Sequence, residues 1–98
     1  MSVVNCQLFG MKIIKFTALW CADCIVMRPY WVEIASKYPD LEIIEIDFDD
    51  NPDLAEKHGV KKVPHTIILT DDETELHRLE GMQNKEDLMK LLEGYLKQ

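Results

Sequence analysis

The sequence predicts an α/β domain whose mixed four-stranded sheet is flanked by helices on both faces. Apolar runs rich in β-branched and aromatic residues alternate with segments of helical spacing, in the order β-α-β-α-β-β-α. Strands joined through helices imply parallel pairing, whereas a short link at 71–73 implies an antiparallel hairpin. The 98 residues suffice for one small domain. We therefore expect a single domain over 1–98, with its core at about 12–97.

The first half of the chain contains two predicted strands with a helix between them. Residues 12–19 are largely β-branched and aromatic, which favours a strand. Residues 23–38 have apolar side chains at helical spacing, and Pro29 inside this helix should remove one hydrogen bond and kink the axis. Residues 41–48 form the second predicted strand. Residues before 12 give no clear pattern.

The second half begins with a short predicted helix. Asn51 suits an N-cap and Pro52 the first helical position, so the helix is predicted to run to His58 and stop at the following glycine. Strands are then predicted at 65–69 and about 74–80.

The last predicted helix begins after Asn84, whose side chain can cap it. Its leucines fall on one face, which we expect to pack on the sheet: Leu88, Leu91, Leu92 and Leu96.

Composition argues against several classes of partner. The net charge of −7 disfavours nucleic acid and anionic membranes. No apolar run of about 18 residues predicts a membrane span, and the first residues do not resemble a secretory signal. Three cysteines do not make a structural disulfide framework. We expect a cytoplasmic monomer.

The most informative motif is Trp20-Cys21-Ala22-Asp23-Cys24, which follows the first predicted strand and opens the first helix. A helix N-terminus presents free backbone N–H groups and the positive end of the helix dipole. A thiolate is stabilised there, and a second cysteine one turn later is close enough to attack the first. The pair therefore predicts a dithiol that cycles with its disulfide.

The chain resembles the thioredoxin superfamily over roughly residues 12–97. The likeness depends on the C-x-x-C after a strand, Pro29, Asn51-Pro52 before a short helix, and Val63-Pro64 before a strand. The resemblance implies a thioredoxin-like fold in which Pro64 is a cis proline beside the dithiol. It also implies that the Val63 backbone pairs with an incoming substrate chain like an added strand.

Several positions depart from thioredoxin. The cysteines enclose Ala22-Asp23 instead of Gly-Pro, and His65 stands where thioredoxin usually has threonine. Thioredoxins carry a buried aspartate six residues before the first cysteine and a lysine on the neighbouring strand. Here those positions hold Lys15 and Glu45, so the two charges are exchanged.

The resemblance and the motif together assign roles to the site residues. Cys21, expected to be exposed, is the nucleophile, and the more buried Cys24 resolves the mixed disulfide. We hypothesise that Glu45 serves as the base for Cys24 and that Lys15 stabilises the thiolates. The alternative is that the side chains of Lys15 and Glu45 both reach solvent at the end of the sheet.

Five further residues are assigned a role near the dithiol or left open. Asp23 adds a negative charge that should favour the disulfide and lower the redox potential. Ala22 and Asp23 together form the dipeptide between the cysteines, which we expect to tune that potential. Trp20 is expected to pack over the dithiol. His65 is considered as a contact of the active site because it directly follows Pro64. Cys6 is either a semi-buried free cysteine or a site of intermolecular disulfide formation or glutathione capture.

The function indicated is that of a thiol–disulfide oxidoreductase that reduces protein disulfides. Its electrons would come from a separate reductase or a thiol pool, because the chain has no nucleotide-binding motif and no cofactor is expected. Two alternatives remain: a non-catalytic binding module of the same fold, and a zinc site using Cys21, Cys24 and either Cys6 or a histidine.

Overall fold

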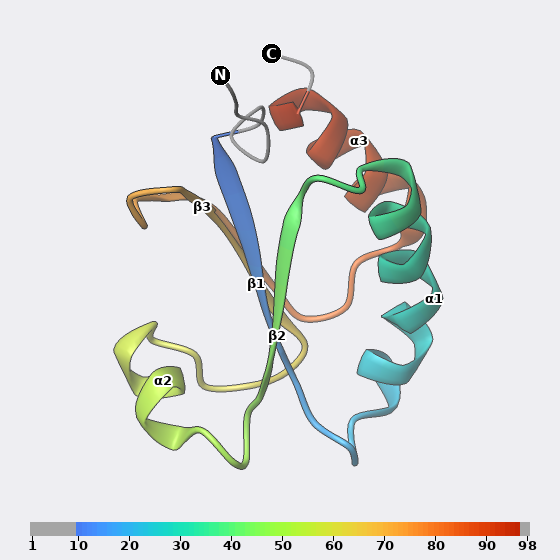
Figure 1. Ribbon diagram of the computed structural model, residues 1–98. Coiled ribbons are helices and arrows are strands. Elements are labelled where there is room, and N and C mark those ends of the chain that lie inside the picture. The colour runs from blue at the N-terminus through green and yellow to red at the C-terminus, as the bar shows by residue number, and fades with distance from the viewer. Residues whose placement is uncertain (1–9, 97–98) are drawn as a thin grey trace.

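The structure is a computed structural model that describes residues 10–96 (Figure 1). Its elements are β1 (Met11–Thr17), α1 (Ala22–Lys37), β2 (Glu42–Asp47), α2 (Pro52–Lys57), β3 (His65–Thr70), β4 (Glu75–Glu80) and α3 (Lys85–Leu96). The predicted class, a mixed four-stranded sheet with helices on both faces, is confirmed. No helix within 10–96 is long and apolar enough to cross a membrane.

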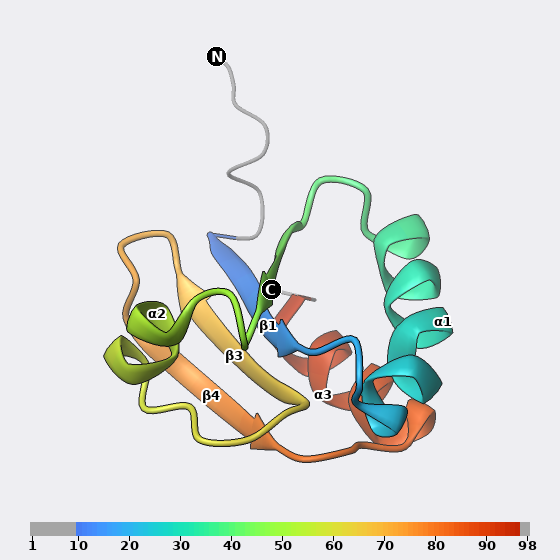
Figure 2. The ribbon, with the colours of Figure 1, turned by 90° about the horizontal axis from the view of Figure 1, so that it is seen from below.

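The sheet has the order β2-β1-β3-β4, so β1 and β3 are its central strands. β1 is parallel to β2, while β1–β3 and β3–β4 are antiparallel. Figure 2 shows α2 on one face of this sheet and α1 with α3 on the other. The loops after β1 and β2 leave the sheet at the same end, at the bottom of Figure 1, because parallel strands finish at the same edge.

One expectation about strand direction is wrong. β3 is antiparallel to β1, and thus to β2, although a helix connects β2 to β3. The reason is that α2 has only six residues and does not carry the chain back along the sheet. The chain therefore enters β3 at the edge where β1 finishes, with His65 paired to Phe16.

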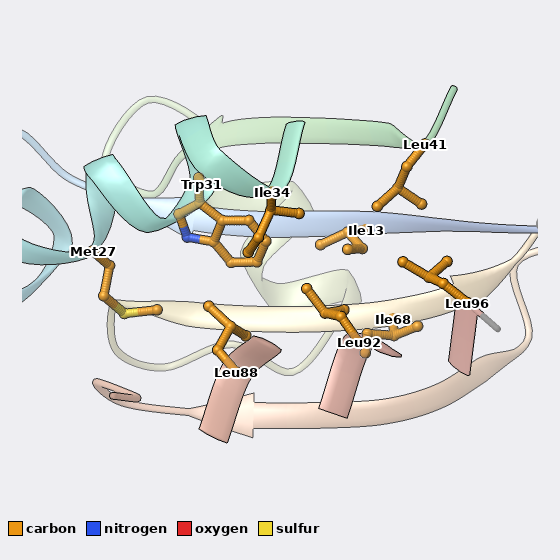
Figure 3. Packing of buried hydrophobic residues seen from close by; sticks show 9 residues of the cluster. All are labelled: Ile13, Met27, Trp31, Ile34, Leu41, Ile68, Leu88, Leu92 and Leu96. Carbon is orange, nitrogen blue, oxygen red and sulfur yellow. The ribbon is translucent and has the colours of Figure 1, made fainter. Parts of the chain in front are cut away.

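The larger core lies between the sheet and the helices α1 and α3 (Figure 3). Its buried members are Ile13, Met27, Trp31, Ile34, Leu41, Ile68, Leu88, Leu92 and Leu96. Each such side chain contributes about 1.5–3 kcal/mol when fully buried. The summed free energy of burying these side chains exceeds the destabilisation of about 3 kcal/mol that a proline inside a helix causes. α1 accordingly continues through Pro29 to Lys37.

The loop between β2 and α2 is held by Asp47. Its carboxylate accepts hydrogen bonds from the backbone N–H groups of Asp49 and Asp50, at 2.9 and 3.0 Å. Asn51 occupies the N-cap position but makes no capping bond with its side chain, and its Nδ2 instead donates to the Asp47 carbonyl oxygen. The predicted cap of α3 does form, since the Asn84 Oδ1 accepts from the Asp87 N–H at 2.8 Å.

Candidate active site

The dithiol lies where β1 gives way to α1. Cys21 is the N-cap of α1, and its Sγ accepts a hydrogen bond from the Cys24 backbone N–H at 3.1 Å. Both cysteines are free thiols. The Cys21 sulfur therefore occupies the position where an N-cap oxygen normally sits, facing the positive end of the helix dipole.

Both cysteines are buried, with only 5% of Cys21 and 6% of Cys24 exposed. The expectation that Cys21 is exposed and Cys24 more buried is therefore wrong. The reason is local packing, because Ala18 from the β1–α1 loop and Val63 from the loop before β3 enclose the pair. The Val63–Pro64 peptide bond is cis.

The Cys24 thiol is held in its protonated form. Burial raises its pKa to about 12, and a hydrogen bond with Cys21 and the negative charges of Cys21 and Asp23 act in the same direction. At neutral pH Cys24 is then almost entirely in its thiol form. Attack by this sulfur therefore requires that its proton be taken up as the reaction proceeds.

Lys15 and Glu45 are neighbours in the register of β1 and β2. The Lys15 Nζ lies 3.7 Å from the Glu45 Oε1, and the Glu45 Oε2 accepts from the Thr17 hydroxyl at 3.1 Å. The Lys15 side chain is 12% exposed and the Glu45 side chain 57%. The two charges are thus paired, and the alternative that both side chains reach solvent is wrong for Lys15, which is buried, while the Glu45 side chain is exposed.

The surroundings of the Lys15 ammonium are both apolar and ionic. Its Nζ lies 5.2 Å from the centroid of the Trp31 ring, within the range of a cation–π contact. Burial lowers the pKa of Lys15, and the charge and hydrogen bond of Glu45 oppose that shift.

A small cavity joins this pair to the dithiol. Its volume is about 20 Å³, and its wall includes Lys15, Cys24, Glu45, Pro64 and Thr66. That volume exceeds the 10–15 Å³ needed by one water molecule. A wider hollow of about 320 Å³ shares Lys15 and Glu45 with it. The small cavity lined by Cys24 therefore borders the same Lys15–Glu45 pair as a wider surface hollow.

Trp20 is placed differently from the sequence-based expectation. It is 65% exposed and does not belong to the buried cluster around the two thiols. Its indole Nε1 donates a hydrogen bond to the Asp49 carboxylate in the β2–α2 loop. The ring is therefore tied toward α2 and does not cover the dithiol.

His65 is buried on the other face of the sheet, next to residues that sequence reasoning missed. Its Nε2 lies 3.1 Å from the Arg78 Nη1, and the same guanidinium donates two hydrogen bonds to Glu75. Arginine cannot accept, so the His65 Nε2 is the acceptor and Nδ1 carries the proton. Burial and the charge of Arg78 lower the pKa of His65. The β3–β4 hairpin register is the signal that could have predicted this contact.

Metal ligands do not converge in the described part of the chain. Among residues 10–96 no group of three or more His, Cys, Asp or Glu side chains is arranged to hold a metal ion. Cys6, the third ligand considered from sequence, lies outside the described residues.

The family model described as Thioredoxin matches residues 7–94. The chain belongs to the thioredoxin family. It is 35% identical over 83 residues to a thioredoxin of Chlamydia trachomatis, covering 85% of this chain and 80% of that protein. It is 38% identical over 79 residues to a thioredoxin H-type of Fagopyrum esculentum, and this match covers 81% of this chain and 67% of that protein.

Solved thioredoxin structures share this fold over most of the chain. The thioredoxin NaTrxh of Nicotiana alata superposes with a TM-score of 0.82 at 30% identity, covering 93% of this chain and 77% of that one. A mutant thioredoxin of Halobacterium salinarum superposes with a TM-score of 0.77 at 31% sequence identity, and the match covers 89% of this chain and 75% of that one. At the level of the thioredoxin family, these relatives support a thiol–disulfide oxidoreductase.

The difference between the two thiols predicts selective alkylation. When the reduced protein is treated with iodoacetamide at pH 8, we expect Cys21 to react at least about tenfold faster than Cys24, because only thiolates are alkylated. Mass spectrometry of proteolytic peptides would measure the ratio. The same reaction in guanidinium chloride is the control, in which both cysteines should react alike. Equal labelling in the folded protein would contradict the assignment.

Proposed function

We propose that this protein reduces disulfide bonds in other proteins by exchange with its Cys21–Cys24 dithiol. The observation that carries the proposal is the position of the Cys21 sulfur at the N-terminus of α1, hydrogen-bonded to the Cys24 N–H. A helix N-terminus stabilises a thiolate. Cys24, whose pKa is raised to about 12, stays protonated until the second exchange, in which its sulfur attacks Cys21. The two sulfurs are thus suited to different steps.

The reaction consists of two exchanges. The Cys21 thiolate attacks one sulfur of the substrate disulfide, whose S–S bond breaks and releases the other sulfur as a thiolate. Cys24 then loses its proton and attacks the Cys21 sulfur, which expels the second substrate thiolate. The substrate gains two electrons, and the Cys21–Cys24 pair becomes a disulfide. A separate reductase or a thiol pool returns it to the dithiol.

The substrate chain would bind at the loop that encloses the dithiol. Val63 packs against the two cysteines and directly precedes the cis Pro64. An extended chain that pairs with the Val63 backbone would bring its disulfide to Cys21, in the manner of an added strand. Trp20 would supply an exposed aromatic surface beside it. Because Cys21 is enclosed, this binding must also open access to its sulfur.

The Cys24 proton would leave through the small cavity. Glu45 and Cys24 both line it, and a single water molecule fits between polar groups there. The Glu45 carboxylate is the base, and its exposure lets it pass the proton to solvent. The Lys15 ammonium, 3.7 Å from Glu45 and on the same cavity wall, stabilises the thiolate that forms.

We expect the protein to work as a monomer in the reducing cytoplasm. In that compartment a separate reductase or a strongly reducing thiol pool would keep the Cys21–Cys24 pair in its dithiol form. Proteins that carry accessible disulfides are then its substrates, and the direction of electron flow is from this protein to them.

Redox titration tests the function. Equilibration in graded thiol–disulfide buffers, followed by thiol counting with mass spectrometry, should show one two-electron transition near −270 mV, roughly the potential of thioredoxin. Reduced protein should also reduce a disulfide-bonded protein substrate, and a Cys21→Ser variant should not. A potential near roughly −120 mV would mean an oxidant. Lack of any transition would reject the oxidoreductase.

Replacing the proposed base should slow only the second exchange. For Glu45→Gln we expect the unimolecular release of substrate thiol to slow by about tenfold or more, because Cys24 loses its proton acceptor. Stopped-flow measurement separates this phase from the concentration-dependent first exchange. Glu42→Gln, on the same strand at its far end, is the matched control. An unchanged second phase in Glu45→Gln would remove Glu45 from the mechanism.

The dipeptide between the cysteines should tune the potential. The Asp23 charge raises the pKa of Cys24 and so disfavours the dithiolate. Ala22 adds no charge. Asp23→Asn should therefore raise the potential by about 5–20 mV, the equivalent of one exposed charge interaction. The redox titration above measures it, with Glu86→Gln in the first turn of α3 as a control for net charge. A fall in potential would contradict this role of Asp23.

A further inference from the structure

The segment that joins α2 to β3 (Figure 2) carries the residues that enclose the dithiol from the β3 side. This segment, residues 58–64, which we call the proline loop, contains no helix or strand and ends in Val63 and Pro64. Val63 packs against Cys21 and Cys24. Because the loop has no ladder of hydrogen bonds of its own, contacts from neighbouring elements must set the position of Val63.

Backbone hydrogen bonds hold the loop near each end. The Val60 N–H donates to the Ala55 carbonyl oxygen at 2.7 Å, which ties the start of the loop to α2. The Gly81 N–H, just beyond β4, donates to the Pro64 carbonyl oxygen at 2.8 Å. The end of the loop is therefore supported from β4.

The side chain of Arg78 on β4 supports both ends at once. Its Nη1 donates to the His65 Nε2 at 3.1 Å, directly after the loop. The same Nη1 lies 3.9 Å from the position that a Cβ on Gly59 would occupy, near the start of the loop. Its Nε and Nη2 donate to the two carboxylate oxygens of Glu75 at 2.9 and 2.7 Å. The carboxylate therefore fixes the orientation of the guanidinium.

The contact between Arg78 and His65 is largely buried. His65 is 2% exposed, and the Arg78 side chain is 29% exposed. The His65 Nδ1 is buried and has no hydrogen-bond partner among residues 10–96. A hydrogen bond with a charged donor is stronger than a neutral one, and a buried polar group that loses its partner destabilises its surroundings. The position of His65 therefore depends on Arg78.

We propose that Arg78 is a positioning residue of the reaction, whose guanidinium ties the two ends of the proline loop together and so sets Val63 beside the dithiol. This inference rests on the proposed function, in which the Val63 backbone pairs with the substrate chain. Arg78 lies on the opposite side of the loop from the sulfurs and acts only through His65 and Gly59. Its loss should weaken the pairing of the substrate chain and leave the thiol chemistry unchanged.

The contact also requires that His65 be neutral. An imidazolium has no lone pair to accept the Arg78 N–H, and its charge would repel the guanidinium. Burial and the charge of Arg78 lower the pKa of His65 from its ordinary value of 6.5. The hydrogen bond is therefore kept at neutral pH and is lost as the pH falls below that value.

Other charged groups around His65 come from three elements. Glu75 and Glu80 on β4 favour its protonation, whereas Lys62 of the proline loop disfavours it. The β1 residue opposite His65 is the apolar Phe16, and the ring of His58, the C-cap of α2, packs edge-on against Phe16. Because His58 also titrates in acid, the pH test below needs a variant that changes position 65 alone.

Two substrates with the same leaving group isolate the pairing of the substrate chain. One is a short extended peptide whose cysteine is joined to 5-thio-2-nitrobenzoate, and the other is cysteine amide joined to the same group. Release of the thionitrobenzoate by reduced protein is followed by absorbance, and each rate is divided by the rate with dithiothreitol. The peptide rate divided by the cysteine amide rate, which we call the chain ratio, cancels the reactivity and titration of Cys21.

Replacing the guanidinium should lower the chain ratio. For Arg78→Gln we expect a fall of about threefold to tenfold, the equivalent of one net hydrogen bond. Lys37→Gln is the matched control, because it also removes one positive charge and one ion pair, on the α1 face. Glu75→Gln changes only a partly exposed carboxylate, so it should fold normally and lower the ratio by about twofold.

A methylated peptide distinguishes positioning from a general loss of stability. Methylation of the peptide amides next to the cysteine removes the donors that could pair with the Val63 backbone. The chain ratio of this peptide should be low in the wild type, and Arg78→Gln should not lower it further. A fall of equal size for the methylated and unmethylated peptides would overturn the positioning role.

The pH profile tests the part played by His65. As the pH is lowered from about 7.5 to about 5, the wild-type chain ratio should fall along the titration of His65, which NMR of the imidazole signals follows. His65→Gln offers an amide oxygen to Arg78 but does not titrate, so its ratio should stay constant. Equal profiles of the wild type and His65→Gln would overturn the inference.

The outcomes separate this inference from the proposed function. If the wild type releases thionitrobenzoate from cysteine amide no faster than Cys21→Ser does, the oxidoreductase itself is rejected. If the wild type reacts but Arg78→Gln and Lys37→Gln have the same chain ratio, the protein is an oxidoreductase in which Arg78 does not position the loop.

Discussion

The antiparallel pairing of β1 with β3 is the constraint on which the site depends. Phe16 and His65 face each other in this pairing, so the chain leaves β1 and enters β3 at the same edge of the sheet. The residues just beyond that edge, Cys21 on one side and Val63 on the other, are therefore packed together despite their distance in sequence. The same edge receives the end of β2, which is parallel to β1 and brings Asp47 and the acidic loop to this side.

Local patterns predicted the elements well, because each depends on neighbouring residues. Hydrophobic periodicity located α1 and α3, Asn51-Pro52 located the start of α2, and the capping side chain of Asn84 located the start of α3. The direction of β3 was not predictable in this way, since a helix between two strands usually signals a parallel crossover. The six-residue length of α2, together with the loop that follows it, decides the direction instead.

Within the site, the sequence predicted that Lys15 and Glu45 meet, but not that Trp20 turns toward Asp49, nor how deeply each side chain is buried. The pairing of Lys15 with Glu45 was anticipated from the resemblance to thioredoxin, and the register of β1 and β2 places the two residues opposite each other. Exposure depends on what covers each side chain, and only the structure shows that Trp31 covers Lys15 while Glu45 stays open. The burial of Cys21 and the contact of His65 with Arg78 likewise come from segments far apart in the chain.

The placement of the Cys21 sulfur at the N-cap of α1 links electron transfer to folding. In the dithiol state this sulfur accepts the Cys24 N–H, and as a thiolate it also offsets the positive helix end. Oxidation removes that negative charge from the first turn. Unfolding and oxidation form a closed thermodynamic cycle, so the difference in stability between the two redox forms equals the difference in redox free energy between the folded and unfolded chains. Any interaction that stabilises the opening turn of α1 more in one redox form than in the other must therefore shift the midpoint potential by the equivalent free energy.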